Sequence, residues 1–149
     1  MGVLAPALYA LDQVTKHWAL THLQVGEPVA VVPGLLWLSL HLNPGAAFSM
    51  GTQATVVLAI LKLVVLLVLV VVVVPRVRNW LVALATSWLM AGVAGNLTDR
   101  LFRDPGPLRG HVVDFIAVRS FAIFNVADMC ITGAAILIVI WSVRSERGR

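Results

Sequence analysis

Long apolar runs, separated by short polar segments, dominate the chain and predict helices that cross a membrane. The longest run covers about 54–74 and consists almost entirely of valine, leucine, isoleucine and alanine. Further runs cover about 3–20, 80–99 and 123–143. A helix needs roughly 20 apolar residues to cross the hydrocarbon core of a bilayer. The pattern therefore predicts an all-α membrane protein with four transmembrane helices.

A segment between the first two runs has a different period. In LWLSLHLN, residues 36–43, leucine occupies every second position and alternates with larger or polar side chains. Alternation with a period of two is typical of a β-strand, and the NPG that follows from Asn43 is typical of a turn. We expect a small extracytoplasmic β element in the first loop.

Composition supports one membrane domain over residues 1–149. The chain is 60% apolar and only 12% charged, whereas a soluble domain carries about a quarter charged residues. The formal charge is +4, but the basic residues are scattered and are not interleaved with aromatic residues. Basic groups beside membrane spans usually meet anionic lipid headgroups, so we expect a bilayer and no nucleic acid as the partner.

The distribution of lysine and arginine predicts the orientation. Residues 21–53 contain neither, whereas the segment 75–79 and the C-terminal tail together carry five arginines. Cytoplasmic loops are enriched in these residues, so both termini are expected in the cytoplasm. The second loop, about 100–122, carries four arginines of its own and weakens this argument.

Two single residues have ordinary interpretations. Lys62 interrupts the longest apolar run, where a lysine costs about 2.5–3.5 kcal/mol at the helix centre; we favour a lysine that snorkels or packs against a helix over a functional one. Cys130 is the one cysteine, so no internal disulfide is possible. The chain shows no zinc-ligand spacing and no metalloprotease or serine hydrolase motif, and we expect neither a metal nor a cofactor.

Two aspartates stand at the facing ends of the third and fourth runs. Asp99 ends one run and Asp128 begins the next. Consecutive helices joined by a loop run antiparallel, so both carboxylates are expected at the same membrane depth. Asn96 and Asn125 each precede an aspartate by three residues, which places each asparagine on the same helix face as its aspartate. The pattern predicts two carboxylates bracketed by two amides.

Each aspartate alone also has a structural interpretation. Asn125 could cap the fourth helix with Asp128 in its first turn, and Asp99 could be an interface charge beside Arg100. Both together favour a function, because carboxylates at membrane depth usually face a bundle interior or a wet cavity.

Close carboxylates can share a proton. One member then accepts a proton from water while the other donates to a carbonyl oxygen. Helix dipoles favour the proton on Asp99 and the negative charge on Asp128. Two other functions stay open on the residues alone. A small channel or proton-coupled transporter would suit intramembrane Asp, Asn and Lys, although no ladder of polar residues crosses the bilayer. A non-enzymatic scaffold would tolerate Asp→Asn changes at both positions.

Five short motifs together resemble the bacterial lipoprotein signal peptidase family, signal peptidase II. Each has a counterpart in the family in the same order, from residue 12 to residue 128. They are DQVTK (12–16), NPGAAFSM (43–50), GNLTDR (95–100), VVDFI (112–116) and FNVAD (124–128). The family's first span usually has a longer part before the first motif, whereas eleven residues precede Asp12 here.

The resemblance implies a four-span intramembrane aspartic endopeptidase of the bacterial cytoplasmic (inner) membrane. Its expected substrates are prolipoproteins, cut just before a cysteine that carries diacylglycerol, at a site near the extracytoplasmic face. The resemblance assigns Asp99 and Asp128 as the catalytic pair. It implies a supporting or substrate-binding role for Asn43, Asn96, Arg100 and Asn125, and a structural or supporting role for Asp12, Lys16 and Asp114.

The remaining polar motif residues and the second loop lead to further expectations. Asp12 and Lys16 are four residues apart, so an ion pair on one helix face is expected. Arg100 is expected to reach a headgroup or a substrate carbonyl rather than its neighbour Asp99. Residues 100–122 are the candidate gate over the site, with a turn at 104–107. We expect the protein to act as a monomer.

Overall fold

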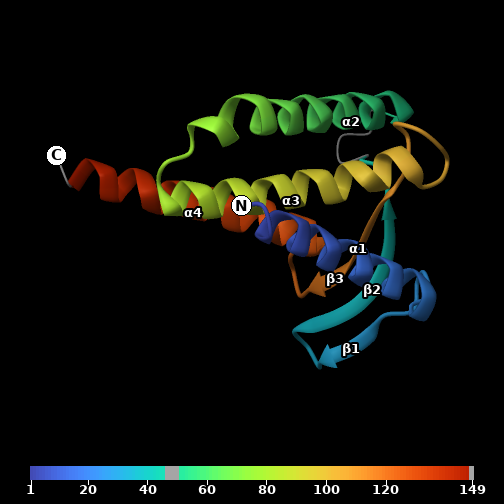
Figure 1. Cartoon of the computed structure of the whole chain (residues 1–149). Helices are drawn as coiled ribbons and strands as arrows, with labels where there is room; N and C mark the ends of the chain where they lie inside the picture. Colours follow the sequence, from blue (N-terminus) through green and yellow to red (C-terminus); the bar gives the residue numbers. More distant parts are fainter. Residues whose placement is uncertain (46–50, 148–149) are drawn as a thin grey trace.

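A computed structural model describes residues 1–45 and 51–147 and shows four long helices beside a small sheet (Figure 1). The last turns of α2 are wound first as a π-helix and then as a 3₁₀-helix. The bounds of these helical segments are α1 Leu4–His22, α2 Gly51–Val68, η1 Leu69–Val73, η2 Val74–Arg76, α3 Trp80–Phe102 and α4 Val126–Arg147.

Three helical stretches of the described residues are long and apolar enough to cross a membrane. They are Thr55–Arg76, Trp80–Phe102 and Val126–Glu146, which confirms a mostly helical membrane protein. The predicted span at about 3–20 forms α1, but α1 is not among these stretches. The polar residues of α1, which include the buried Asp12 and Lys16, lower its hydropathy.

A four-stranded antiparallel sheet is built from both of the loops that follow α1 and α3. Its order is β1-β2-β3-β4, with bounds β1 Val29–Val32, β2 Leu36–Asn43, β3 Val112–Val118 and β4 Ile123–Phe124. The strand predicted at 36–43 is confirmed. A shift in register between Leu38 and His41 interrupts its alternation, so the adjacent Ser39 and Leu40 are both buried.

The second loop is more ordered than the sequence analysis predicted. Residues 112–118 form β3, which pairs with β2 along most of its length. Residues 123–124 form β4 rather than the start of the last helix, and α4 begins at Val126. The run VVDFIAV is rich in β-branched and aromatic residues, which favour strands, and is too short to cross a membrane.

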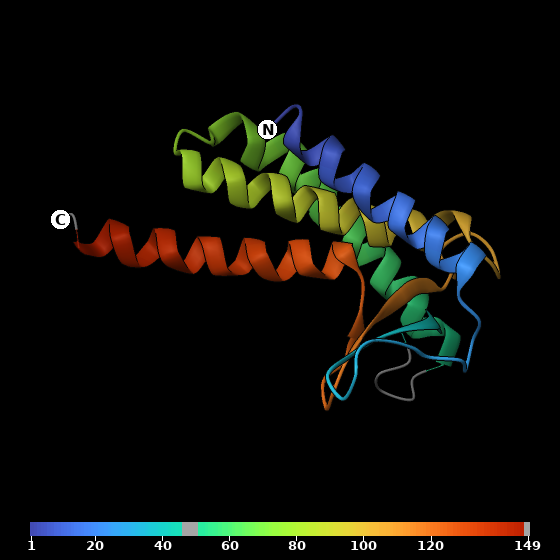
Figure 2. The ribbon, with the colours of Figure 1, turned by 90° about the horizontal axis from the view of Figure 1, so that it is seen from below.

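The sheet lies at one end of the helices, and both chain termini lie toward the other end (Figure 2). α1 ends and α4 begins beside the sheet, so polar residues from both helices can meet residues of β3. A small apolar core joins α1 to the sheet through Ala19, Leu23, Leu40, Val113 and Phe115. α2 and α4 instead expose many large apolar side chains, as expected for helices that face lipid.

Candidate active site

A buried polar cluster forms where α1, the C-terminal half of α3, β3 and the first turn of α4 meet. Seven of its side chains are at most 4% exposed, and all seven are charged or carboxamide groups predicted to act at the site. They are Asp12, Lys16, Asn96, Asp99, Arg100, Asp114 and Asn125. Buried groups of this kind must find partners, because an unpaired charge away from water is costly.

Close helix packing brings these residues together. A Cβ atom on Gly95 of α3 would collide with the Asp12 carboxylate, and one on Gly92 would collide with the backbone oxygen of Ala127 in α4. The two glycines therefore let α3 approach α1 and α4 at the depth of the cluster. Asp12 also accepts a hydrogen bond from the backbone N–H of Ala127, over 2.8 Å, and so ties α1 to the start of α4.

Lys16 is the centre of one half of the cluster. Its Nζ lies 2.9 Å from Asp12 Oδ2, which confirms the predicted ion pair on α1. The same Nζ lies 2.8 Å from Asp99 Oδ2 and donates to Asn96 Oδ1 over 2.9 Å. A single buried ammonium group thus joins α1 to two residues of α3.

Asp99 is enclosed by positively charged partners. In addition to Lys16, its Oδ1 accepts a hydrogen bond from Arg103 Nε over 2.6 Å, and its Oδ2 accepts one from the backbone N–H of Val113 over 3.3 Å. The side chain is 0% exposed. No hydrogen bond joins it to Asp128 within the described part of the chain. Both carboxylate oxygens of Asp99 are thus bonded to cations or to a backbone N–H.

Asp128 lies at the first turn of α4 and is half-buried. Its Oδ2 accepts from the backbone N–H of Asn125 over 3.2 Å, and Asn125 Oδ1 accepts from the backbone N–H of Asp128 over 3.0 Å. These reciprocal bonds are a capping box, so the structural interpretation of this pair is confirmed. Asp128 Oδ1 remains available and accepts from Asn96 Nδ2 over 2.8 Å.

Asp114 of β3 is the carboxylate that shares a partner with Asp128. Its Oδ1 accepts from Asn125 Nδ2 over 2.6 Å, and its Oδ2 accepts from Asn43 Nδ2 over 2.9 Å. Burial raises the pKa of Asp114 from 3.8 to about 6; the hydrogen bonds from Asn43 and Asn125 and the charge of Lys16 act to lower the pKa, and the negative charge of Asp128 raises it. Asp114 is therefore poised to hold a proton near neutral pH.

Asn96 and Asn125 connect the two halves of the cluster. Asn125 Nδ2 donates to Asn96 Oδ1 over 3.2 Å as well as to Asp114. Asn96 in turn contacts Lys16 with its oxygen and Asp128 with its nitrogen. The predicted bracketing of carboxylates by two amides is therefore present, but the carboxylates that the two amides bracket are Asp114 and Asp128.

Arg100 does not point to a headgroup. Its side chain is buried, and its Nη1 donates to the backbone oxygens of Gly110, over 3.2 Å, and Pro44, over 3.4 Å. Within the described residues its Nε has no hydrogen-bond partner. Arg100 thus fastens the loop after α3 to the segment after β2. Residues 46–50 of the NPGAAFSM motif lie outside the described residues.

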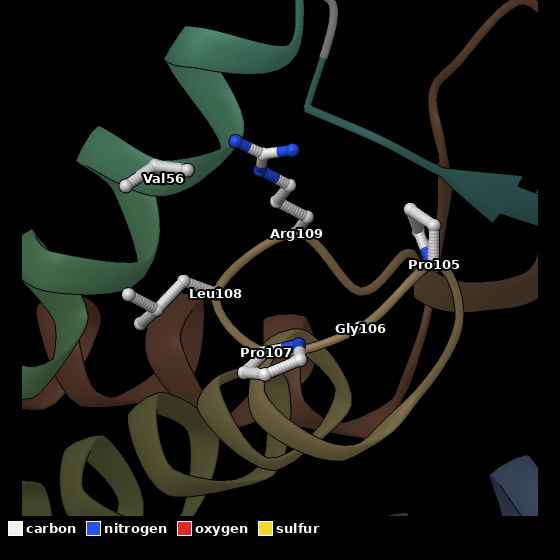
Figure 3. Close-up of a pocket in the computed structure, with 6 residues that line it drawn as sticks. All are labelled: Val56, Pro105, Gly106, Pro107, Leu108 and Arg109. Atoms are coloured by element: carbon white, nitrogen blue, oxygen red, sulfur yellow. The ribbon is translucent and has the colours of Figure 1, made fainter.

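The predicted turn at 104–107 borders a separate pocket of about 380 Å³. Figure 3 shows Leu108 and Arg109 extending from this loop toward α2, where Val56 closes the pocket. None of the nine residues predicted to act at the site lines this pocket. In the described part of the chain, no group of three His, Cys, Asp or Glu side chains is placed to hold a metal ion.

The fold, four long helices beside a small antiparallel sheet, is that of solved membrane enzymes. A bacterial membrane enzyme determined in meso at 2.3 Å resolution has a TM-score of 0.85 and 31% identity, over 99% of this chain and 89% of that chain. A second, at 1.9 Å, has a TM-score of 0.82 and 34% identity, over 93% and 88%.

The particular family follows from the sequence comparisons. The family model for signal peptidase (SPase) II matches residues 4–144. The lipoprotein signal peptidase of Mycobacterium avium (strain 104) is 42% identical over 94% of this chain and 76% of that protein. That of Mycobacterium tuberculosis (strain ATCC 25618 / H37Rv) is 43% identical over 94% and 69%. The chain belongs to the signal peptidase II family of membrane proteases, which process prolipoproteins, and this excludes the transporter and scaffold alternatives.

Proposed function

We propose that this protein is an aspartic endopeptidase that removes the signal peptide of prolipoproteins just before a diacylglyceryl-modified cysteine. We further propose that Asp114 and Asp128 are its catalytic pair. The observation that carries this assignment is Asn125, which bonds both carboxylates, while neither carboxylate has a cation within hydrogen-bond distance among residues 1–45 and 51–147. Family membership supports the protease activity.

This assignment replaces the pair Asp99 and Asp128 predicted from the sequence. A general base or acid must be able to exchange a proton during the reaction. Asp99 is held by two cations and a backbone N–H and is fully buried, so protonating it would break a charge-balanced cluster. Asp114 lies among amides, and its pKa is already raised to about 6.

The geometry suggests a role for each carboxylate. Asp128, which accepts hydrogen bonds from Asn96 and from the N-terminus of α4, is the base that takes a proton from the attacking water. Asp114 is the acid that donates its proton to the scissile carbonyl oxygen. The water oxygen bonds to the carbonyl carbon, and the tetrahedral intermediate then collapses. Its C–N bond breaks as Asp128 gives the proton it took from water to the cysteine nitrogen. Asp114 takes back the proton of the hydroxyl that becomes the carbonyl of the product acid, so the pair again holds one proton.

We also propose that α1 is a fourth span and that the sheet is extracytoplasmic. α1 turns its polar residues into the cluster, while Val3, Leu11, Val14 and Trp18 are exposed, as expected for a helix that contacts lipid on its outer side. The sheet lies at the end of the molecule away from both termini (Figure 2). With the lysine- and arginine-free segment 21–53, this supports termini in the cytoplasm, and a single-domain monomer is the simplest form.

The experiment that tests the catalytic pair compares three isosteric variants in one assay. Asp114→Asn, Asp128→Asn and Asp99→Asn are purified in detergent and given a diacylglyceryl-modified prolipoprotein. Asp114→Asn and Asp128→Asn are expected to fold and to lose turnover by about a thousandfold or more, because each removes one member of a unit. Asp99→Asn is expected to keep turnover well above both.

Each contrary result has a definite meaning. If Asp114→Asn cleaves near the wild-type rate while Asp99→Asn does not, the catalytic pair is the one predicted from the sequence. In either case, if the Asp128→Asn variant cleaves near the wild-type rate, the aspartic mechanism is wrong. Size-exclusion profiles and melting temperatures of all three variants serve as the control for folding.

A further inference from the structure

We propose that Lys16 is a positioning residue that fixes the direction of the Asn96 carboxamide and thereby keeps a hydrogen-bond donor on Asp128. The inference rests on the proposed role of Asp128 as the base. It gives the buried ion cluster around Asp99 a function in the reaction, although none of that cluster's charged groups touches Asp114 or Asp128.

The ammonium group of Lys16 has no freedom to choose other partners. It carries three N–H donors, and three acceptors surround it: Asp12 Oδ2, Asp99 Oδ2 and Asn96 Oδ1, at 2.8–2.9 Å. The side chain is 0% exposed. Asp12 and Asp99 come from different helices, so the position of Nζ is fixed by both α1 and α3.

A carboxamide has one end that accepts and one end that donates, and Lys16 determines which end of Asn96 faces Asp128. An ammonium group can only donate, so the Asn96 oxygen must face Lys16. The Asn96 nitrogen then faces Asp128 Oδ1, 2.8 Å away. With the amide reversed, an N–H would meet the ammonium and an oxygen would meet the carboxylate, which are two repulsive contacts in a buried site.

Asn125 gives the same amide a second, weaker constraint. Its Nδ2 donates to Asn96 Oδ1 over 3.2 Å, but the same nitrogen donates to Asp114 over only 2.6 Å. Without Lys16, the direction of Asn96 would depend on this shared donor. We therefore expect the loss of Lys16 to slow the reaction without abolishing it.

Lys16 cannot be replaced alone in a clean experiment. Asp12 and Asp99 balance the charges of Lys16 and Arg103, so removal of the ammonium leaves a buried excess of negative charge. The double variant Lys16→Met/Asp99→Asn removes one charge of each sign and restores the balance. Its matched control, Lys16→Gln/Asp99→Asn, has the same charge but keeps a side-chain N–H donor that can approach Asn96 Oδ1.

The test measures kcat and KM for both double variants with the diacylglyceryl-modified prolipoprotein. Lys16→Met/Asp99→Asn is expected to lose kcat by about tenfold or more with little change in KM, because a hydrogen bond to a charged group is lost. The kcat of Lys16→Gln/Asp99→Asn is expected to be about fivefold higher than that of Lys16→Met/Asp99→Asn, because the glutamine restores a neutral hydrogen bond to Asn96. A purely structural role would move the melting temperature and leave the two kcat values equal.

Equal kcat values in the two folded double variants would overturn the inference, as would a rise in KM with kcat unchanged. If Lys16→Met/Asp99→Asn does not fold, Asn96→Leu is measured instead. Loss of kcat there supports the inference, and a wild-type kcat overturns it. Asp128→Asn is run in the same assay: if it is active, the proposed catalytic pair fails, whereas an inactive Asp128→Asn beside equal double variants refutes the role of Lys16 alone.

Discussion

The two halves of the polar cluster contain the same kind of group in opposite surroundings. Asp99 on α3 is bonded by Lys16 and Arg103, whereas the side-chain partners of Asp114 on β3, within the part of the chain that the structure describes, are the amides of Asn43 and Asn125. Both are buried. One carboxylate is paired with cations, while burial among neutral donors raises the pKa of the other to about 6. On the proposed assignment, the partners of a buried carboxylate, rather than its depth, distinguish the structural group from the reactive one.

Access to water differs between the halves as well. Asp12, Lys16 and Asp99 are at most 1% exposed, so these three members of the ion-paired half are closed to water. Asp128, which shares Asn125 with Asp114, is half-buried. A water molecule or a peptide bond can therefore approach the amide-bonded half without opening the ion-paired half. If Asp114 and Asp128 are the catalytic pair, this division allows one half to hold the helices together while the other half reacts.

The largest expected effect on stability comes from breaking the ion-paired half. Asp99→Ala leaves Lys16 and Arg103 with an uncompensated buried charge, which typically costs about 3–5 kcal/mol. We expect a large fall in the melting temperature of the detergent-solubilised protein. The control is Asp104→Ala, because Asp104 is exposed and surface substitutions usually change stability by less than about 0.5 kcal/mol. Similar melting temperatures for both variants would show that the cluster does not stabilise the fold.

A smaller effect, on pH dependence, is expected from the amide-bonded half. Burial raises the pKa of Asp114 to about 6 from 3.8, so between these values the folded protein binds a proton that the unfolded chain does not. The stability that this group contributes is present below pH 4 and is lost as the pH rises through 6. The difference amounts to about 3 kcal/mol.

Melting curves of wild type and Asp114→Asn at several pH values check this sign. The melting temperature of wild type should fall relative to that of Asp114→Asn between about pH 4 and pH 6 and then stay level. A wild type that gains stability relative to the variant over that range would mean that a positive partner lowers the pKa of Asp114. The contrast between the two halves would then disappear.

Local patterns of the sequence were sufficient to predict the elements and the residues of the cluster. The strand at 36–43 follows from alternation, and the pair Asp12–Lys16 follows from helical spacing. Asn96, Asn125 and Asp128 were placed together because helices that follow one another run antiparallel. These predictions depend on contacts that are local or that follow from simple topology.

The catalytic partner that we propose for Asp128, Asp114, could not be chosen in this way. The sequence pattern predicts a loop for the segment that contains Asp114. Its place in the cluster depends on the pairing of β3 with β2, which lies some seventy residues away in sequence. VVDFIAV carried a strand signal in its β-branched residues, but nothing local shows that His41 pairs with Asp114. The sequence likewise shows Arg103 only as one of four arginines in the second loop, and no local pattern predicts that it pairs with Asp99.

The smallest expected effect separates the two cations within the ion-paired half. Arg103 bonds Asp99 as closely as Lys16 does, but its side chain is 26% exposed. Water can therefore replace part of the stabilisation that the Arg103–Asp99 ion pair contributes. Arg103→Met should therefore cost less than about 1 kcal/mol and should leave the direction of Asn96 unchanged, because Arg103 has no contact with that amide. If Arg103→Met instead lowers kcat as much as Lys16→Met/Asp99→Asn does, the total charge around Asp99 controls the reaction, and the contact between Lys16 and Asn96 does not.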